Sequence, residues 1–272
     1  MIQVPSFAEK RKLFDWLVAN KSMLLTQKKS IVKHTDAVSH SSSLLNEVSE
    51  EVMKSEAIPE TATRIKVRFV ANTTKLFDSH GDVHIDQLWN KSIKENKDNF
   101  HVKMHQFDFE GVISDNVKVF AKQMAWGDLG YAFEGQTQAL LFDSIIDKAE
   151  SPYMFEKYRQ GKIKQHSVGM RYIKVDLAIN DDRYEKEFEL WQKYIDMIVN
   201  KTEVMEAGYF YPVTEAKLIE GSAVLRGSNY TTPTLTVQQV KQEPSNDTLD
   251  EPARTTLNLD LVAKFYQPLK HI

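Results

Sequence analysis

The spacing of hydrophobic residues changes several times along the chain, and each spacing predicts a different element. Between Phe7 and Val38 these residues recur at helical intervals with no internal glycine or proline, which predicts one or two amphipathic helices. From Arg64 to Phe69 apolar and basic residues alternate strictly, as in a half-buried strand. The pattern from Gln138 to Gln160 favours a helix, which Gly161 would end.

The second half of the chain continues this alternation of periods. It predicts a long strand over Ile163–Ile179, a helix over Arg183–Lys201 and a further strand over Tyr209–Gly227. A turn at Asp78–Asp82 and short strand-like runs complete the pattern, the runs lying at 100–107, 110–121 and 130–133. Strands interrupted by one or two helices predict an α+β fold, built around a barrel or a strongly bent sheet.

Three regions follow from the same pattern. Residues 1–60 are interpreted as a helical arm, and residues 61–235 as the main domain with a helical insertion at 182–206. Residues 236–272 are interpreted as a linker, poor in apolar residues and containing Pro244 and Pro252, followed by a tail that could dock as a short element.

Composition narrows the function. The 272 residues carry a formal charge of −3, which argues against a dedicated nucleic-acid binder. The chain has no cysteine, which removes thiol nucleophiles and disulfide frameworks and favours a reducing cytoplasm. It shows no membrane-length apolar run, no signal peptide and no glycine-rich phosphate loop, so we expect no membrane and no nucleotide.

Charge is also unevenly distributed. Residues 1–35 carry seven basic and two acidic side chains, and residues 36–60 carry one basic and six acidic ones. A basic amphipathic helix can meet a membrane or an acidic partner, but packing on its own domain or on another copy is the simpler interpretation.

Three stretches collect the side chains that could carry chemistry, around His105, Ser167 and Glu220. A serine hydroxyl is a poor nucleophile until a neutral imidazole takes its proton, and a third group must orient that imidazole. Strand alternation places Glu220 on one face with Leu218, Ser222, Val224 and Arg226. The simpler alternatives are a serine bonded to backbone and an exposed ion pair between Glu220 and Arg226.

Histidine pairs raise the alternative of a metal site. His80 and His84, like His101 and His105, have the spacing that places two imidazoles on one helix face, but neither pair contains the glutamate of a zinc-protease motif. In extended chain the second pair would lie about 13 Å apart, too far to share an ion. Asp78, His80 and Asp82 are the better candidates, although turns use such residues anyway, so we expect no metal.

Four motifs in order resemble the tailed-phage prohead proteases, the capsid maturation enzymes related to the herpesvirus assemblins. They are Asp78-Ser79-His80-Gly81-Asp82-Val83, Met104-His105-Gln106, His166-Ser167-Val168-Gly169-Met170 after Gly161-Lys162-Ile163, and Leu218-Ile219-Glu220-Gly221-Ser222-Ala223-Val224, within about residues 61–235. The resemblance implies an assemblin-like bent β-barrel with peripheral helices.

It also implies Ser167 as the nucleophile, His105 as the general base and Glu220 as the third member. Because herpesvirus relatives use a second histidine as third member, His166, His101 and His84 stay as rivals, His166 being the weakest since strand neighbours point to opposite faces. Arg226 with the backbone of Gly227 is assigned to the oxyanion site by analogy, although a Phe-Pro or similar pair is common there in the phage family.

The implied function is a serine endopeptidase without cofactor, acting inside the assembling prohead in the host bacterial cytoplasm. Its expected substrates are scaffold, the scaffold-like part of the major capsid protein and its own termini, with a homo-oligomer possible from the arm. The first alternative is a non-enzymatic head-assembly or scaffold protein that keeps the protease fold. The second is a metal hydrolase centred on His80 and His84.

Overall fold

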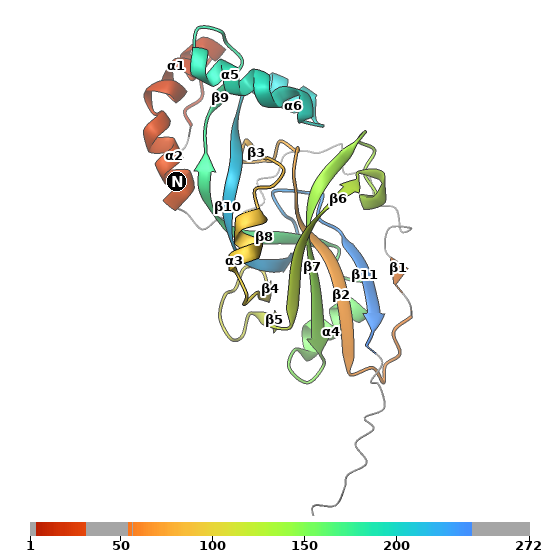
Figure 1. Cartoon of the computed structure of the whole chain (residues 1–272). Helices are drawn as coiled ribbons and strands as arrows, with labels where there is room; N and C mark the ends of the chain where they lie inside the picture. Colours follow the sequence, from red (N-terminus) through yellow and green to blue (C-terminus); the bar gives the residue numbers. More distant parts are fainter. Residues whose placement is uncertain (1–3, 31–53, 56, 241–272) are drawn as a thin grey trace, which may run out of the picture. The chain divides into compact units, whose positions relative to one another are not determined.

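The computed structural model describes residues 4–30, 54–55 and 57–240, and those residues belong to one compact unit ending at Val240 (Figure 1). Two β-sheets pack together and helices lie around them, which confirms the α+β class. None of the helices in these residues has the length and apolar character that a membrane span requires. The predictions for residues 31–53 and 241–272 lie outside the described residues.

The first sheet has five strands in the order β1-β11-β2-β7-β6. Neighbouring strands in this sheet are antiparallel, except for β1 and β11, which are parallel. The strands are β1 (Lys54–Ser55), β2 (Arg64–Thr73), β6 (Val117–Ala125), β7 (Gln136–Asp147) and β11 (Thr234–Gln239). The alternation seen in the sequence is confirmed in β2, because Ile65, Val67 and Phe69 are buried.

The second sheet is organised by its longest strand, β10. β3 and β4 pair with β10 in parallel, β8 and β9 pair with it antiparallel, and β5 extends the sheet beyond β4. The strands are β3 (Asp82–His84), β4 (His101–Lys103), β5 (Val112–Ser114), β8 (Gln165–Val175), β9 (Ala178–Ile179) and β10 (Tyr209–Val224). One strand therefore touches most of the motifs singled out above.

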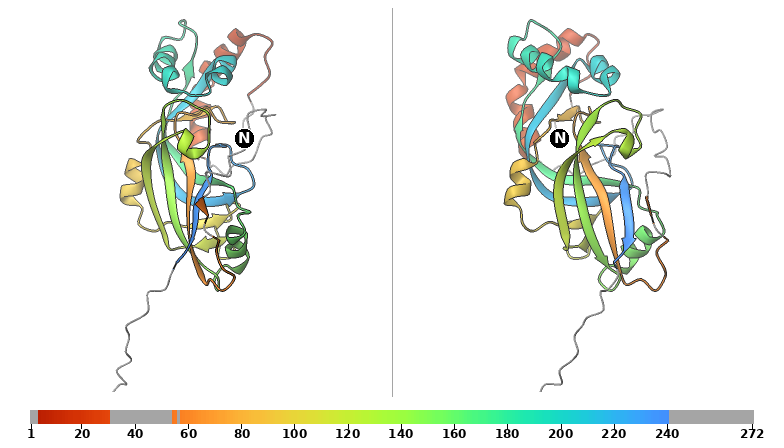
Figure 2. Two further views of the ribbon diagram at one scale, coloured as in Figure 1. Left: turned by 90° about the vertical axis from the view of Figure 1, so that its right-hand side faces the viewer. Right: turned by 45° about the vertical axis from the view of Figure 1, so that its right-hand side comes forward.

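The helices lie outside the sheets (Figure 2). They are α1 (Lys10–Ala19), α2 (Lys21–Ser30), α3 (Asn90–Glu95), α4 (Pro152–Arg159), α5 (Glu185–Tyr194) and α6 (Lys201–Ala207), with 3₁₀ turns η2 (Gly127–Leu129) and η3 (Ile195–Met197). Of the one or two helices expected over Phe7–Val38, the described residues contain two, α1 and α2. They bury Phe14, Leu17 and Leu24 in the main core, so this part of the arm packs on its own domain.

The core lies between the two sheets. Phe69 of β2 stacks on Phe142 of β7 with ring centroids 5.1 Å apart. A Cβ at Gly221 of β10 would lie 2.6 Å from the Phe142 ring, so the sheets approach closely at this point. The expected barrel is not formed, because neither sheet closes on itself. An isolated bridge between Gln165 of β8 and Pro233, just before β11, links the two sheets in the described residues.

The helix expected over Gln138–Gln160 is wrong in its first half. That half belongs to β7, a central strand buried on both faces, with Leu140, Phe142 and Ile146 in the main core and Ala139 and Leu141 in a second cluster. Burial on both faces removes the polar residues that would have marked a period of two. The second half does contain a helix, α4, and Gly161 follows it with a left-handed φ of 65°.

Other boundaries shift by a few residues. The long strand over Ile163–Ile179 divides into β8 and β9, and the helix over Arg183–Lys201 becomes α5 and η3, with α6 beginning at Lys201. The strand expected at 130–133 is absent, since these residues form a loop. β11 continues to Gln239, so sheet structure enters the segment interpreted as a linker.

Candidate active site

Two neighbouring strands, β8 and β10, position two of the three candidate side chains. Glu220 lies opposite Gly169, and Ser222 lies opposite Ser167. Directly opposed residues share one face of a sheet, and so do residues two apart on one strand. Ser167 therefore shares a face with Glu220, and this face points away from the Phe142 side that Gly221 occupies.

Gly169 makes room for the Glu220 side chain. A Cβ at position 169 would lie 2.2 Å from Glu220 Oε1, well inside van der Waals contact. The carboxylate thus lies directly over the backbone of the residue two positions from Ser167. Along an extended strand two residues span about 7 Å, so the serine emerges beside the carboxylate.

His105 reaches the same face from the end of β4. Met104 and His105 both have left-handed backbones, with φ of 49° and 58°. Such conformations cost about 1–3 kcal/mol each in non-glycine residues and persist where neighbouring contacts hold them. The Met104 N–H donates to Ala223 O at 2.9 Å, and the His105 N–H donates to Ser222 Oγ at 2.8 Å.

The His105 ring pairs with the Glu220 carboxylate. Nδ1 of His105 lies 2.6 Å from Oε1 of Glu220, and the two side chains are 7% and 0% exposed. Such a contact fixes the proton on Nδ1 and leaves Nε2 as the atom through which the ring takes up a proton. Oε2 of Glu220 is buried without a hydrogen-bond partner in the described residues, so the carboxylate acts on the histidine in a medium of low polarity.

Ser222 is a site residue to which its sequence motif assigns a face of the strand but no role. Its Oγ accepts the His105 N–H and donates to Val102 O at 3.3 Å, joining β10 both to β4 and to the turn that carries the histidine. The available signal was its spacing of two residues from Glu220. Spacing of two could show a shared face, but not a hydrogen bond to another strand.

A β-bulge changes the face assigned to Leu218. The pairing shifts by one residue between Leu218, which faces Met170, and Glu220, which faces Gly169. Leu218 consequently lies in the core, and its expected place on one face with Glu220 is wrong. The bulge residue itself, Ile219, has no counterpart on β8.

The segment assigned to the oxyanion site lies beside β8. A Cβ at Gly227 would lie 2.9 Å from His166 O, so the backbone of this segment passes directly next to the residue before Ser167. The Arg226 side chain is exposed, and the described residues give it no ion pair. The simpler alternative, an exposed ion pair between Arg226 and Glu220, is therefore wrong, because Glu220 pairs with His105.

Two of the rival histidines, His101 and His166, lie in the core on the opposite face. Tyr158 OH bridges them, at 2.9 Å from His101 Nε2 and 2.8 Å from His166 Nε2. His101 Nδ1 also lies 3.0 Å from Ser144 Oγ, and the His166 ring stacks on Phe69 at 4.0 Å. Burial lowers the pKa of His101 well below its usual value and lowers the pKa of His166 to about 3.

These buried histidines predict a loss of stability in mild acid. Because the folded pKa of His166 is about 3 and an unfolded histidine has a pKa near 6.5, the unfolded chain takes up protons first as the pH falls. Between pH 7 and pH 5 we expect His166 alone to lower the free energy of unfolding by about 2 kcal/mol, with full stability above pH 6.5. Urea unfolding at both pH values measures this loss.

The variant His166→Gln supplies the comparison, since glutamine keeps a polar group near Tyr158 but does not titrate. The wild-type chain is expected to lose more stability between the two pH values than the variant does. Equal losses would contradict the assignment of the acid sensitivity to this histidine.

The third rival, His84, belongs to a separate buried network. Its Nδ1 lies 2.8 Å from Asn72 Nδ2, and its Nε2 lies 3.0 Å from the hydroxyl of Tyr172. Tyr172 donates to Asp82 Oδ2 at 2.8 Å, and Lys28 of α2 contacts Asp82 Oδ1 at 2.5 Å. The network thus ties the helical arm to the sheet.

The predicted turn at residues 78–82 is confirmed, and it uses its own polar groups. Asp78 Oδ1 accepts the N–H groups of His80 and Asp82 at 2.8 and 2.9 Å. In the described residues no three histidine, aspartate or glutamate side chains cluster in a way that could hold a metal ion. Turn formation and the arm contact therefore account for the acidic residues of this motif.

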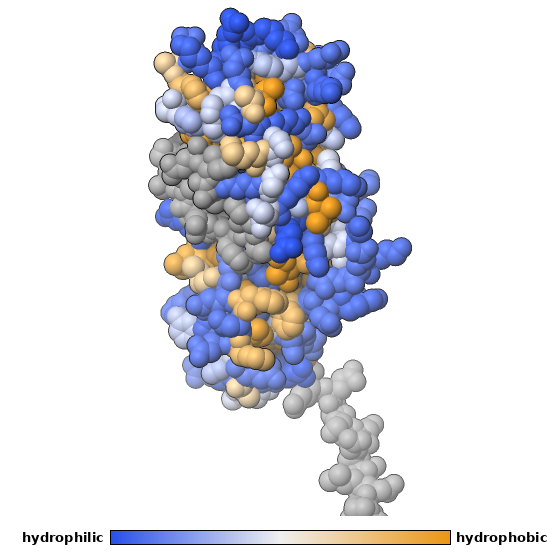
Figure 3. All heavy atoms as spheres, turned by 90° about the vertical axis from the view of Figure 1, so that its left-hand side faces the viewer, coloured by the Kyte–Doolittle hydropathy of each residue, from blue (hydrophilic) through white to orange (hydrophobic). Residues whose placement is uncertain are grey.

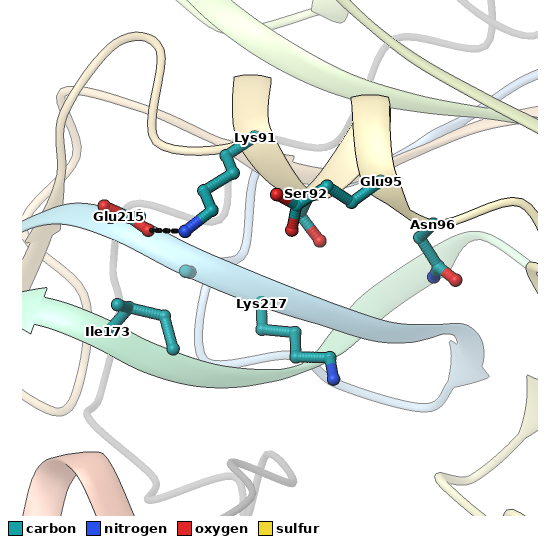
Figure 4. Close-up of a pocket in the computed structure, with 8 residues that line it drawn as sticks. Lys91, Ser92, Glu95, Asn96, Ile173, Glu215 and Lys217 are labelled. Atoms are coloured by element: carbon teal, nitrogen blue, oxygen red, sulfur yellow. Dashed lines mark ion pairs between the residues drawn. The ribbon is translucent and has the colours of Figure 1, made fainter.

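A pocket of about 300 Å³ lies elsewhere, between α3 and the strands β8 and β10 (Figure 4). Half of its lining residues are charged, and Glu215 pairs with Lys91 at 3.4 Å. The lining residues are Lys91, Ser92, Glu95, Asn96, Ile173, Glu215, Ala216 and Lys217. It includes none of the candidate site residues.

Comparison with protein-family models, with curated proteins and with solved structures finds no match to this chain.

Proposed function

We propose that the chain is a serine endopeptidase in which Ser167 is the nucleophile, His105 the general base and Glu220 the orienting acid. The observation that carries the proposal is the buried contact between His105 Nδ1 and Glu220 Oε1, on the face that Ser167 shares. If the pair of His105 and Glu220 only stabilised the fold, the left-handed backbones of Met104 and His105 would be a cost without a purpose. Strain held by surrounding contacts is typical of reacting groups.

The reaction follows from the roles of the three groups. His105 Nε2 takes the proton of Ser167 Oγ as the oxygen attacks the carbonyl carbon of the substrate. The tetrahedral intermediate then expels the amine, to which His105 returns the proton, and an acyl-enzyme forms. Water, deprotonated by the same nitrogen, releases the acid and restores the serine. Glu220 keeps the Nδ1 proton in place and stabilises the imidazolium throughout.

The oxyanion has a proposed binding place in the segment Arg226–Gly227. Its backbone runs against His166, the neighbour of the nucleophile, and the exposed Arg226 guanidinium can turn toward developing negative charge. Backbone N–H groups and a cation at this point would supply the electrostatic stabilisation that acyl transfer requires.

The biological setting is proposed from the resemblance of the four motifs to prohead proteases. The chain order of the three residues supports this proposal: His105 follows β4, Ser167 lies on β8 and Glu220 lies on β10. We therefore place the reaction inside an assembling prohead, with scaffold and capsid protein as substrates. The alternative of a non-enzymatic assembly protein predicts that Ser167 is unreactive.

Reaction with a small fluorophosphonate tests the proposal. The purified full chain is expected to gain one adduct, located at Ser167 by peptide mass spectrometry, because only an activated serine reacts at an appreciable rate. Ser151→Ala, at the start of α4, should be labelled like the wild type. Absence of an adduct at Ser167 in a folded chain would reject the peptidase and favour the assembly protein.

A further inference from the structure

The loop that follows His105 exposes large apolar side chains. Phe109 is fully exposed, and Met104 and Phe107 are about half exposed, at 53% and 54%. Leu225, just beyond β10, is 83% exposed. We call these four side chains the apolar rim: Met104, Phe107, Phe109 and Leu225.

The two chain segments that carry the apolar rim are hydrogen-bonded to each other at the candidate site. The Met104 N–H donates to Ala223 O, two residues before Leu225, so the two segments that carry the rim meet beside His105. Figure 3 views the molecule from the side on which the loop between β4 and β5 projects, and hydrophobic side chains are exposed on that face. The rim therefore borders the reacting groups.

The loop is held in a defined shape. Gly111 N–H donates to both the side chain and the backbone oxygen of Asp108, at 2.7 and 3.1 Å, and Lys103 N–H donates to Gly111 O at 2.9 Å. The Phe107 ring packs edge-on against Phe100 with centroids 5.4 Å apart. A fixed loop that presents phenylalanines to water is typical of a binding surface.

Exposure of large apolar residues is concentrated at this place. Nine such side chains are exposed in the described residues, and four of them form the rim. The other five are spread over other parts of the chain, namely Val4, Met23, Tyr153, Ile173 and Met205. Scattered apolar residues need no explanation, whereas a group beside a reacting centre does.

We infer that the apolar rim selects the peptide bond to be cut, by holding a large apolar side chain of the substrate, such as leucine, isoleucine, methionine or phenylalanine, close to that bond. This inference rests on the proposed function. The occupant is a polypeptide substrate because the rim shares a loop with His105 and adjoins Arg226. Whatever binds the rim consequently lies against the groups that carry out the reaction.

Cleavage of a mixed peptide library by the full-length protein tests the inference. Mass spectrometry of the products should show large apolar residues enriched at one position within a few residues of the cut. In the double variant Phe107→Ser with Phe109→Ser, kcat/KM for the peptides that the wild type prefers should fall by about tenfold or more, mainly through KM. Labelling of Ser167 by the small fluorophosphonate should stay within twofold.

Met205→Ser on α6 is the matched control, because its side chain is 48% exposed and lies outside the rim. Normal Ser167 labelling with no apolar preference, or with no cleavage at all, would overturn the inference and leave the proposed function standing. If the wild-type protein is neither labelled at Ser167 nor able to cleave peptides, the proposed function is rejected. A double variant that only changes from dimer to monomer in sedimentation would assign the rim to a second copy, against the inference.

Discussion

Replacing Ser167 with alanine should reduce peptide cleavage by a factor of about 10⁴ or more, because the acyl-enzyme can no longer form. The fold should survive, since Ser167 is a small residue and alanine leaves the pairing of β8 with β10 intact. Co-expression of the full chain with the scaffold and capsid proteins that we propose as substrates measures the effect as the fraction of processed protein. Unchanged processing by the alanine variant would show that Ser167 is not the nucleophile.

The variant Ser167→Cys gives a second measure that needs no substrate. Since the chain has no cysteine, the new thiol is the sole one, and its reactivity reports on position 167 alone. Beside an imidazole that accepts its proton, the thiol should react with iodoacetamide well below pH 8.5, the ordinary pKa of cysteine. The further change His105→Ala should move the reaction back to alkaline pH. A thiol unaffected by this change would separate His105 from the nucleophile.

Replacing Glu220 with glutamine should lower kcat by about 10²–10⁴ with little change in KM. Glutamine has nearly the same shape but can donate to Nδ1, which favours the tautomer that carries its proton on Nε2 and cannot accept one from serine. Peptide cleavage kinetics measure the loss. Thermal stability should be retained or rise slightly, because a buried charge with one unpartnered oxygen is removed.

Glu215→Gln is the matched control on the same strand. Glu215 pairs with Lys91 and Lys174 at 3.4 and 2.6 Å and lies in the separate pocket, so its loss should leave kcat within twofold. A Glu220→Gln chain that cleaves at the wild-type rate would remove Glu220 from the mechanism, whatever its contact with His105.

The sequence predicts those elements best in which burial is one-sided. β2 alternates apolar and basic residues from Arg64 to Phe69, and its first residue follows from that alternation, whereas the strand continues to Thr73. The residues of β7 from Gln138 onward fit a helical pattern in the sequence because apolar residues pack on both faces of this strand. A continuous run of apolar residues fits the period of a helix as well as that of a strand. β7 is a strand because it pairs with β2 and β6, and these contacts are made with residues distant in the sequence.

The candidate site shows a similar division. The sequence motifs name His105 and Glu220 separately, and the structure pairs their side chains through contacts that no spacing reveals. The bulge at Ile219, the space above Gly169 and the hydrogen bond from His105 to Ser222 all depend on how β4, β8 and β10 are brought together. His101 was an open rival in sequence, and its burial with Tyr158 could be seen only in the fold.

The bulge at Ile219 sets the phase of β10. Amino-terminal to it, Ala216 and Leu218 point into the core, and an unbroken alternation would send Glu220 and Ser222 inward as well. One extra residue reverses the phase, so that the last third of the strand turns its polar residues outward and Gly221 inward toward Phe142. The last of the three register shifts between β10 and β8 therefore lets one continuous strand contribute to the hydrophobic interior and still present Glu220 on the opposite face near its carboxyl end.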